Sequence, residues 1–326
     1  MSTPVETANV TRTRLVWMDL LRGSAMLLLI LYHASAIVAL YGQVLPRWLV
    51  VFNEIFLPFR MPTLMFLSGM LLAGSLRKPL KPYYWGKFKF VVWPYIIWTV
   101  VHSFTYGLPW PLYNPKAWIA TGYLWFLFYL GVFYALAPLL RRVPPLLIVV
   151  VSWAISVPLE TPVEKRFFFL AGFFFLGHFC QSQGAKFERL INSWIVLALF
   201  PLAIGFSLYS AIYGPFRYQG SLAIFSVLGI LVFARLAMKF QNQHWTRPIR
   251  YIGRNSIIFY TTHFPIIIVV ISLSMLIFGA PLWAVVPLDF AVALLGGLSF
   301  AYLAARGPVK YLFQAPDPFD KFLARS

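Results

Sequence analysis

Long apolar runs, separated by short polar connections, follow one another along almost the whole chain. A helix needs roughly 20 apolar residues to cross the hydrocarbon core of a bilayer. The pattern therefore predicts ten membrane-spanning helices, over residues 15–40, 48–74, 88–106, 120–140, 145–158, 167–182, 191–213, 218–238, 255–279 and 283–304. The runs at 145–158 and 167–182 are shorter than the others. An even number of spans places both ends of the chain on the same side of the membrane.

The Lys and Arg residues are distributed unevenly between the connecting segments. If the N-terminus lies inside, 20 of the 27 basic residues fall in inner segments and 5 in outer ones, while Arg22 and Arg60 lie within spans. Membrane proteins carry an excess of basic residues on the cytoplasmic side. Both termini are therefore expected in the cytoplasm, as short tails over about residues 1–14 and 305–326.

Composition supports a membrane protein and argues against a soluble one. The chain is 60% hydrophobic and 11% charged, with a mean hydropathy of +0.77, whereas a soluble domain averages about 45–50% apolar and about 25% charged residues. We expect a single domain over residues 1–326, an all-α polytopic bundle of about ten transmembrane helices in the lipid bilayer. The single Cys180 excludes an internal disulfide, and no Cys/His spacing indicates a metal.

The net charge of +18 is expected to face the cytoplasm. Membrane topology and attraction to anionic lipid headgroups explain such a charge. An electropositive entrance for a phosphorylated cytosolic cofactor is a compatible alternative. Nucleic acid is not an expected partner, because the basic residues are scattered over short loops beside the spans.

The first apolar run is interrupted by Asp19, Arg22 and His33. Arg22 and His33 are eleven residues apart, which places both on one face of a helix, separated by about 16 Å along its axis. Asp19 joins this face and can pair with Arg22. Ionisable groups within a membrane-spanning helix face a bundle interior or a water-filled cavity. In one alternative, the acidic and basic pair only locks the helix end and His33 is a satisfied core histidine. In another, residues 34–36 end a cleaved signal peptide, which the charges within the apolar run disfavour.

Four segments resemble, in the same order, the membrane acyltransferase-3 family. They are DLLRGSAMLLLILYH (19–33), MPTLMFLSGML (61–71), LWFLFYL (124–130) and IGRNSIIFYTTHFPI (252–266). The resemblance implies a ten-helix integral enzyme that moves an acyl group, usually acetyl, onto a hydroxyl of a sugar or glycolipid. The chain departs from the family at Arg60, where relatives often carry His, and it shows no hydrolase-like extracytoplasmic domain of the kind that some relatives append.

Acyl transfer from a thioester needs a group that removes the proton of the acceptor. An imidazole suits this role at neutral pH, so His33 is the candidate general base, or a transient acyl carrier that passes acetyl to the outer face. The permanently charged guanidinium of Arg22 suits a phosphate of CoA, and it could equally orient Asp19. We expect these three residues to form the catalytic set.

Further residues are candidates for binding the two substrates. For the CoA donor they are Arg22, Ser68, Gly69, Lys81, Lys87, Lys89, Arg250 and Arg254. The alternatives are helix packing for the Ser-Gly pair and anchoring at the membrane surface for the three lysines. For the acceptor or the developing oxyanion they are Arg60, His102, Trp125, Tyr260 and His263. Here the alternatives are core packing and, for the arginine, an ion pair with Glu54.

These observations predict an acetyl-CoA-dependent acyltransferase of cell-envelope carbohydrates or glycolipids, in a bacterial inner or plasma membrane and without a metal. N-acylation of an amino sugar stays open beside O-acetylation. The main alternative is a carrier that exports a small polar or lipid-linked molecule, with Asp19, Arg22 and His33 as a proton relay. A non-catalytic scaffold or receptor would leave the buried polar stripe without a purpose.

Overall fold

The computed structural model of the protein describes residues 15–105, 114–214, 216, 218–279 and 283–316. Within these ranges the chain forms helices and no strand, which confirms the predicted all-α class. The α-helices are α1 (Val16–Leu40), α2 (Arg47–Met70), α3 (Leu72–Ser75), α4 (Leu80–Lys87), α5 (Trp93–Thr105), α6 (Trp125–Leu136), α7 (Pro145–Ser156), α8 (Pro162–Ser182), α9 (Ala185–Asn192), α10 (Trp194–Ala198), α11 (Phe200–Tyr213), α12 (Ala223–Phe240), α13 (Arg247–Arg254), α14 (Ser256–Phe278) and α15 (Val286–Arg306). A π-helical turn, η1 (Phe88–Val92), joins α4 to α5, and the short turn η3 (Gly122–Leu124) leads into α6.

Six helical segments of the described chain are long and apolar enough to cross a membrane. They are Val16–Leu40, Arg47–Ser75, Trp194–Tyr213, Gly220–Phe240, Ser256–Phe278 and Trp283–Arg306, and each falls on a predicted span. The four other predicted spans coincide with α5 to α8. Of these, Gly122–Leu136 and Pro145–Ser156 are shorter apolar helices, and α8 carries the charged residues 164–166 near its start. The chain is therefore a multi-pass protein by helix length and composition, while the count of ten spans and the cytoplasmic termini remain predictions.

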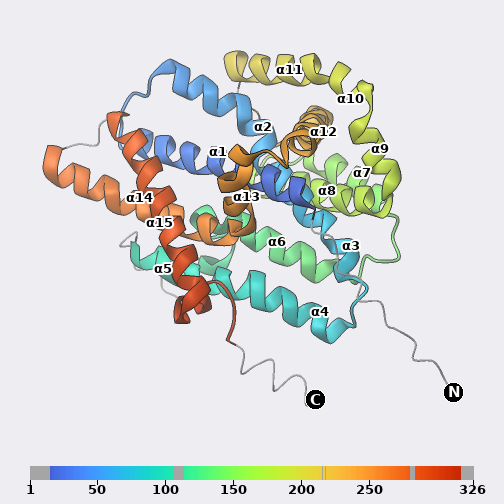
Figure 1. The fold of residues 1–326 in the computed structure, drawn as a ribbon, viewed down its shortest axis with the longest axis horizontal. Helices are drawn as coiled ribbons and strands as arrows, with labels where there is room; N and C mark the ends of the chain where they lie inside the picture. The colour runs from blue at the N-terminus through green and yellow to red at the C-terminus, as the bar shows by residue number, and fades with distance from the viewer. Residues whose placement is uncertain (1–14, 106–113, 215, 217, 280–282, 317–326) are drawn as a thin grey trace.

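Helix α1 lies in the middle of the bundle (Figure 1), where it packs against α2, α12, α13, α14 and α15. Its contact with α13 is a backbone contact made possible by two glycines. A Cβ on Gly23 would lie 1.9 Å from the carbonyl oxygen of Ile249, and a Cβ on Gly253 would lie 1.8 Å from that of Asp19. Because no side chain fits there, α13 is held directly against the first turns of α1, and its Arg254 lies beside Asp19.

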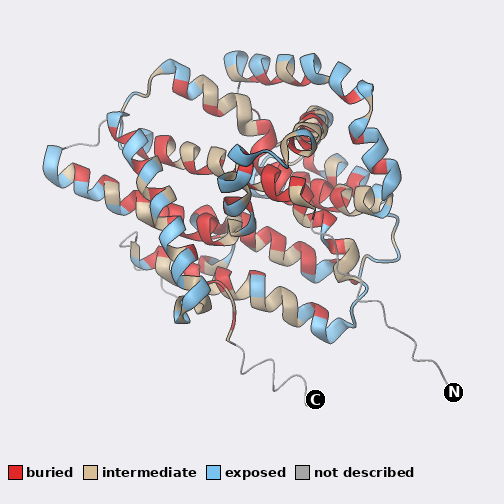
Figure 2. Ribbon diagram, viewed as in Figure 1, coloured by how far each residue is buried: buried red, intermediate tan, exposed pale blue. Residues whose placement is uncertain are grey.

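Burial is concentrated on the central helices, as Figure 2 shows in red for α1, α2, α6 and α8. Apart from Phe59 of α2, their buried apolar side chains belong to one continuous core cluster. The peripheral helix α11 is mostly pale blue in the same view, and it exposes large apolar residues such as Leu202 and Tyr209. Exposed apolar helix faces are what a lipid-facing surface requires. The polar residues of α1 are therefore screened from lipid by surrounding helices.

Candidate active site

Two histidines from distant parts of the chain meet in the core. Nε2 of His263 on α14 lies 3.0 Å from Nδ1 of His33 on α1, and Nδ1 of His263 lies 3.0 Å from the carbonyl oxygen of Phe259. His263 is fully buried, whereas His33 is only partly buried. This contact brings together two candidate site residues that are 230 positions apart in the sequence.

The hydrogen bonds of this pair define which nitrogen of each neutral ring carries the proton. A carbonyl oxygen can only accept, so Nδ1 of His263 is the donor and its Nε2 is left as an acceptor. Nδ1 of His33 must then donate to that Nε2. The lone pair of His33 is consequently on its own Nε2, which is the form that a general base or a nucleophile needs.

Helix α14 is opened locally by a proline next to this pair. Pro265 has no N–H, so the carbonyl of Thr261 four residues earlier lacks its helical partner. The hydroxyl of Tyr123 donates to that carbonyl, and the hydroxyl of Tyr260 donates to the carbonyl of Tyr123. These bonds attach the η3 turn to α14 and fix the aromatic rings around the histidines.

A cavity of about 550 Å³, called the outer cavity after the side on which the predicted orientation of the spans would place it, opens at His33. His102 and Phe264 form part of its wall, together with residues 116, 117 and 119–123, Trp125 and Arg166. Gly122 has a φ of +46°, and a Cβ at this position would lie 2.2 Å from Nε2 of His102. Only glycine allows both the left-handed turn and the close approach of the imidazole, so this wall of the cavity is defined tightly.

A second cavity of about 270 Å³, called the inner cavity in the same predicted orientation, opens at Arg22. Ser68, Lys87, Tyr134 and Tyr260 also line it. Nζ of Lys87 donates to Oγ of Ser75 at 3.1 Å and lies 3.7 Å from the ring centre of Tyr134. Burial lowers the pKa of Lys87 to about 8, with a smaller contribution from the charge of Lys78. The cavity therefore offers a guanidinium and an ammonium group to an anion.

The two cavities are divided by a layer of aromatic rings. Tyr123 borders the outer cavity and Tyr260 the inner one, and their ring centres are 6.0 Å apart. The ring of His263 lies 5.5 Å from Tyr123 and 6.1 Å from Tyr260. Arg22 and His33 thus lie on the same side of α1, as their spacing predicts, but they line different cavities.

Asp19 connects α1 to α13. One of its oxygens is 3.9 Å from Nη1 of Arg22, and the other is 3.3 Å from Nε of Arg254 on α13. Asp19 itself is 3% exposed. Its carboxylate therefore orients both arginines, and neither Asp19 nor Arg254 lines the cavity.

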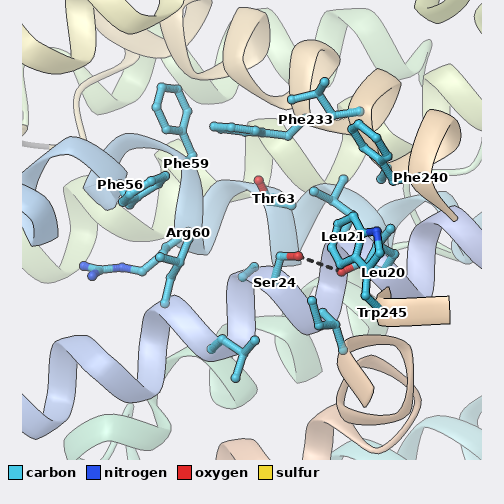
Figure 3. Close-up of a pocket in the computed structure, with 16 residues that line it drawn as sticks. Leu20, Leu21, Ser24, Phe56, Phe59, Arg60, Thr63, Phe233, Phe240 and Trp245 are labelled. Carbon is cyan, nitrogen blue, oxygen red and sulfur yellow. Dashed lines mark hydrogen bonds between the residues drawn. The ribbon is translucent and has the colours of Figure 1, made fainter. Parts of the chain in front are cut away.

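A third cavity of about 380 Å³, drawn in Figure 3, lies on the other side of α1. Its wall is mainly aliphatic and aromatic, with Phe233, Phe240 and Trp245 on one side. Arg60 contributes to the wall, and in Figure 3 its guanidinium points away from Phe240 and Trp245. That group stacks over Tyr32, with Cζ 4.1 Å from the ring centre, instead of forming an ion pair with Glu54.

The remaining candidates lie outside the two polar cavities. Gly69 packs on α8, where a Cβ would lie 1.8 Å from the carbonyl oxygen of Phe174. Lys81 is exposed, Lys89 approaches the ring of Phe90 at 5.6 Å, and Arg250 lies on α13. Four other residues that line the polar cavities were not among the candidates from the sequence, namely Tyr123, Tyr134, Lys116 and Arg166. In the sequence, Lys116 and Arg166 were counted only among the basic residues of the predicted outer segments.

Comparison with known proteins places this chain in a family. A family model described as an acyltransferase domain matches residues 15–306. No curated protein and no solved structure matches the chain. Because the match spans all four resembling segments and includes the histidine pair and both polar cavities, the chain belongs to the acyltransferase-3 family of membrane acyltransferases.

Proposed function

We propose that this protein transfers an acetyl group from cytosolic acetyl-CoA to a hydroxyl of a cell-envelope carbohydrate or glycolipid. The observation that carries the proposal is the 3.0 Å contact between Nδ1 of His33, which lines a cavity, and Nε2 of His263, because this contact leaves the lone pair of His33 on Nε2. A base held in one tautomer by a second hydrogen bond needs no reorganisation before it takes a proton.

In this proposal the acetyl donor uses the inner cavity. Arg22 and Lys87 would contact phosphate groups of CoA, because a guanidinium and an ammonium group both form charge-assisted hydrogen bonds with phosphate. The thin pantetheine arm would extend along α1 toward His33. The aromatic layer of Tyr123 and Tyr260 must then move aside to admit the arm. Between turnovers the closed layer would keep water from the thioester.

The acceptor hydroxyl would meet the thioester beside His33. Nε2 takes the hydroxyl proton while the oxygen attacks the thioester carbon, the carbon–sulfur bond breaks, and the proton passes to the CoA sulfur. A carrier route uses the same lone pair, with Nε2 bearing the acetyl group before the hydroxyl receives it. In both routes His263 accepts a hydrogen bond from Nδ1 and stabilises the positive charge that develops on His33.

The direct test is consumption of acetyl-CoA carrying label in the acetyl group. The purified protein in lipid nanodiscs, supplied with a crude envelope glycan fraction, is expected to release CoA thiol and to place label on the glycan. An exporter that uses Asp19, Arg22 and His33 as a proton relay would neither bind nor consume acetyl-CoA. That result would reject the acyltransferase proposal.

Lys87 gives the donor site a pH dependence. A bound phosphate favours the charged ammonium group, so binding above pH 8 must first add a proton to Lys87. We expect the Kd of desulfo-CoA, which has no thiol to titrate, to rise several-fold between pH 7.5 and 9, with a limit of about tenfold per pH unit. Calorimetric titration over this range measures the effect.

The control variants separate this effect from a general loss of binding. Lys87→Arg keeps a full charge over the whole range, so its affinity should change little with pH. The same change at the exposed Lys81 should leave the wild-type slope intact. An unchanged slope in Lys87→Arg would show that Lys87 does not contact the phosphates.

A further inference from the structure

The wall of the outer cavity carries positive charge without a neutralising carboxylate. Lys116 and Arg166 line it together with His33 and His102, and no Asp or Glu is among its described lining residues. Nε of Arg166 is buried and has no hydrogen-bond partner in the described part of the chain. A buried donor of a cationic group is costly without an acceptor, and a ligand in the cavity would supply one.

Aromatic rings orient Arg166, and no carboxylate of the described residues forms an ion pair with it. Its Cζ lies 4.6 Å from the ring centre of Trp125 and 5.3 Å from that of Tyr218. Tyr218 has a φ of +36°, a conformation that costs energy for any residue with a side chain. Stacking leaves the edge of the guanidinium plane available for the two parallel hydrogen bonds that a carboxylate or phosphate accepts.

A second arginine lies behind this wall. Arg60 is 3% exposed, and its Nε and Nη1 are buried without a hydrogen-bond partner among the described residues. It stacks on Tyr32, whose ring centre is 5.2 Å from that of His33. Its charge acts on Tyr218, as does that of Arg166. The nearby Glu54 forms no ion pair with it, and one oxygen of that carboxylate also lacks a partner.

We propose that the acceptor is an anionic saccharide, whose carboxylate or phosphate is bound by Arg166 in the outer cavity while Arg60 strengthens the field from behind. This inference names the acceptor class of the proposed function and rests on it. The anion on Arg166 would position a neighbouring sugar hydroxyl toward His33. Lys116, which is exposed on the same wall, would add attraction at the cavity entrance.

Binding of three related sugars tests the proposal without any acetyl transfer. Purified protein in phosphatidylcholine nanodiscs is titrated with methyl glucoside, methyl glucuronide and glucose 1-phosphate. At least one charged sugar is expected to bind about tenfold or more tightly than the neutral one, with a preference that weakens as salt is added. The stronger of the two charged sugars identifies the anion as a carboxylate or a phosphate. Equal binding of all three sugars would overturn the proposal.

Matched arginine variants assign the preference to this wall. Arg166→Gln should reduce the preference for the charged sugar about tenfold, and Arg60→Gln should reduce it by a smaller factor. Arg47→Gln removes an exposed arginine outside the cavity and should keep the full preference. If Arg47→Gln lost as much preference as Arg166→Gln, the charge effect would be nonspecific and the site would be rejected.

The sugar titration and the acetyl-CoA assay fail independently. A protein that binds the charged sugar through Arg166 but never consumes acetyl-CoA would refute the acyltransferase proposal and keep the anion site. A protein that consumes acetyl-CoA and binds the three sugars equally would refute the anion site and support the acyltransferase proposal.

Discussion

His33→Ala is expected to lower the rate of acetyl transfer by about 10²–10⁴-fold, the range that positioned acid–base groups contribute. Without Nε2 no group is in place to take the proton of the acceptor hydroxyl or to carry the acetyl group. Binding of desulfo-CoA should stay close to that of the wild type, because His33 lines the outer cavity and the proposed phosphate contacts are in the inner one. Label transfer from acetyl-CoA measures the rate, and calorimetry measures the affinity.

A histidine outside the cavities provides the control for this experiment. His244 is exposed in the turn before α13, and His244→Ala should transfer acetyl at the wild-type rate. Circular dichroism and the elution profile would show that both variants remain folded. Full activity in His33→Ala would remove His33 from the chemistry in either route.

His263→Leu is expected to lower kcat by about 10–100-fold, the effect typical of a partner that orients a functional imidazole. The substitution removes the acceptor for Nδ1 of His33, so the ring can rotate or place its proton on Nε2. The KM values for both substrates should change much less than kcat, because His263 lines neither polar cavity.

The conservative variant and the pH profile distinguish positioning from simple packing. In His263→Gln the side-chain carbonyl can still accept from His33, so this variant should recover a large part of kcat. His263→Leu should in addition move the acidic limb of the pH–rate profile to lower pH, because that limb reports protonation of His33, and the protonated ring loses its hydrogen-bonded partner. Equal losses in both variants with an unshifted profile would indicate a packing role only.

The sequence predicted the helical class and the direction of Arg22 and His33 for the same reason. Apolar runs and helical spacing are local properties, and they fix which residues share a face of one helix. Both residues do lie on the side of α1 that faces the polar cavities. Hydropathy alone does not decide how many helices span the membrane, because four of the ten predicted runs form helices that are short or carry charges.

Only the tertiary structure decided which groups meet around these residues. The bond from His33 to His263, the separation of Arg22 and His33 by an aromatic layer, and the position of Arg166 on the cavity wall join distant segments. The packing of Gly69 on α8 is decided in the same way. Spacing along a helix sets where a side chain points, but its neighbours depend on how helices far apart in the chain pack against one another.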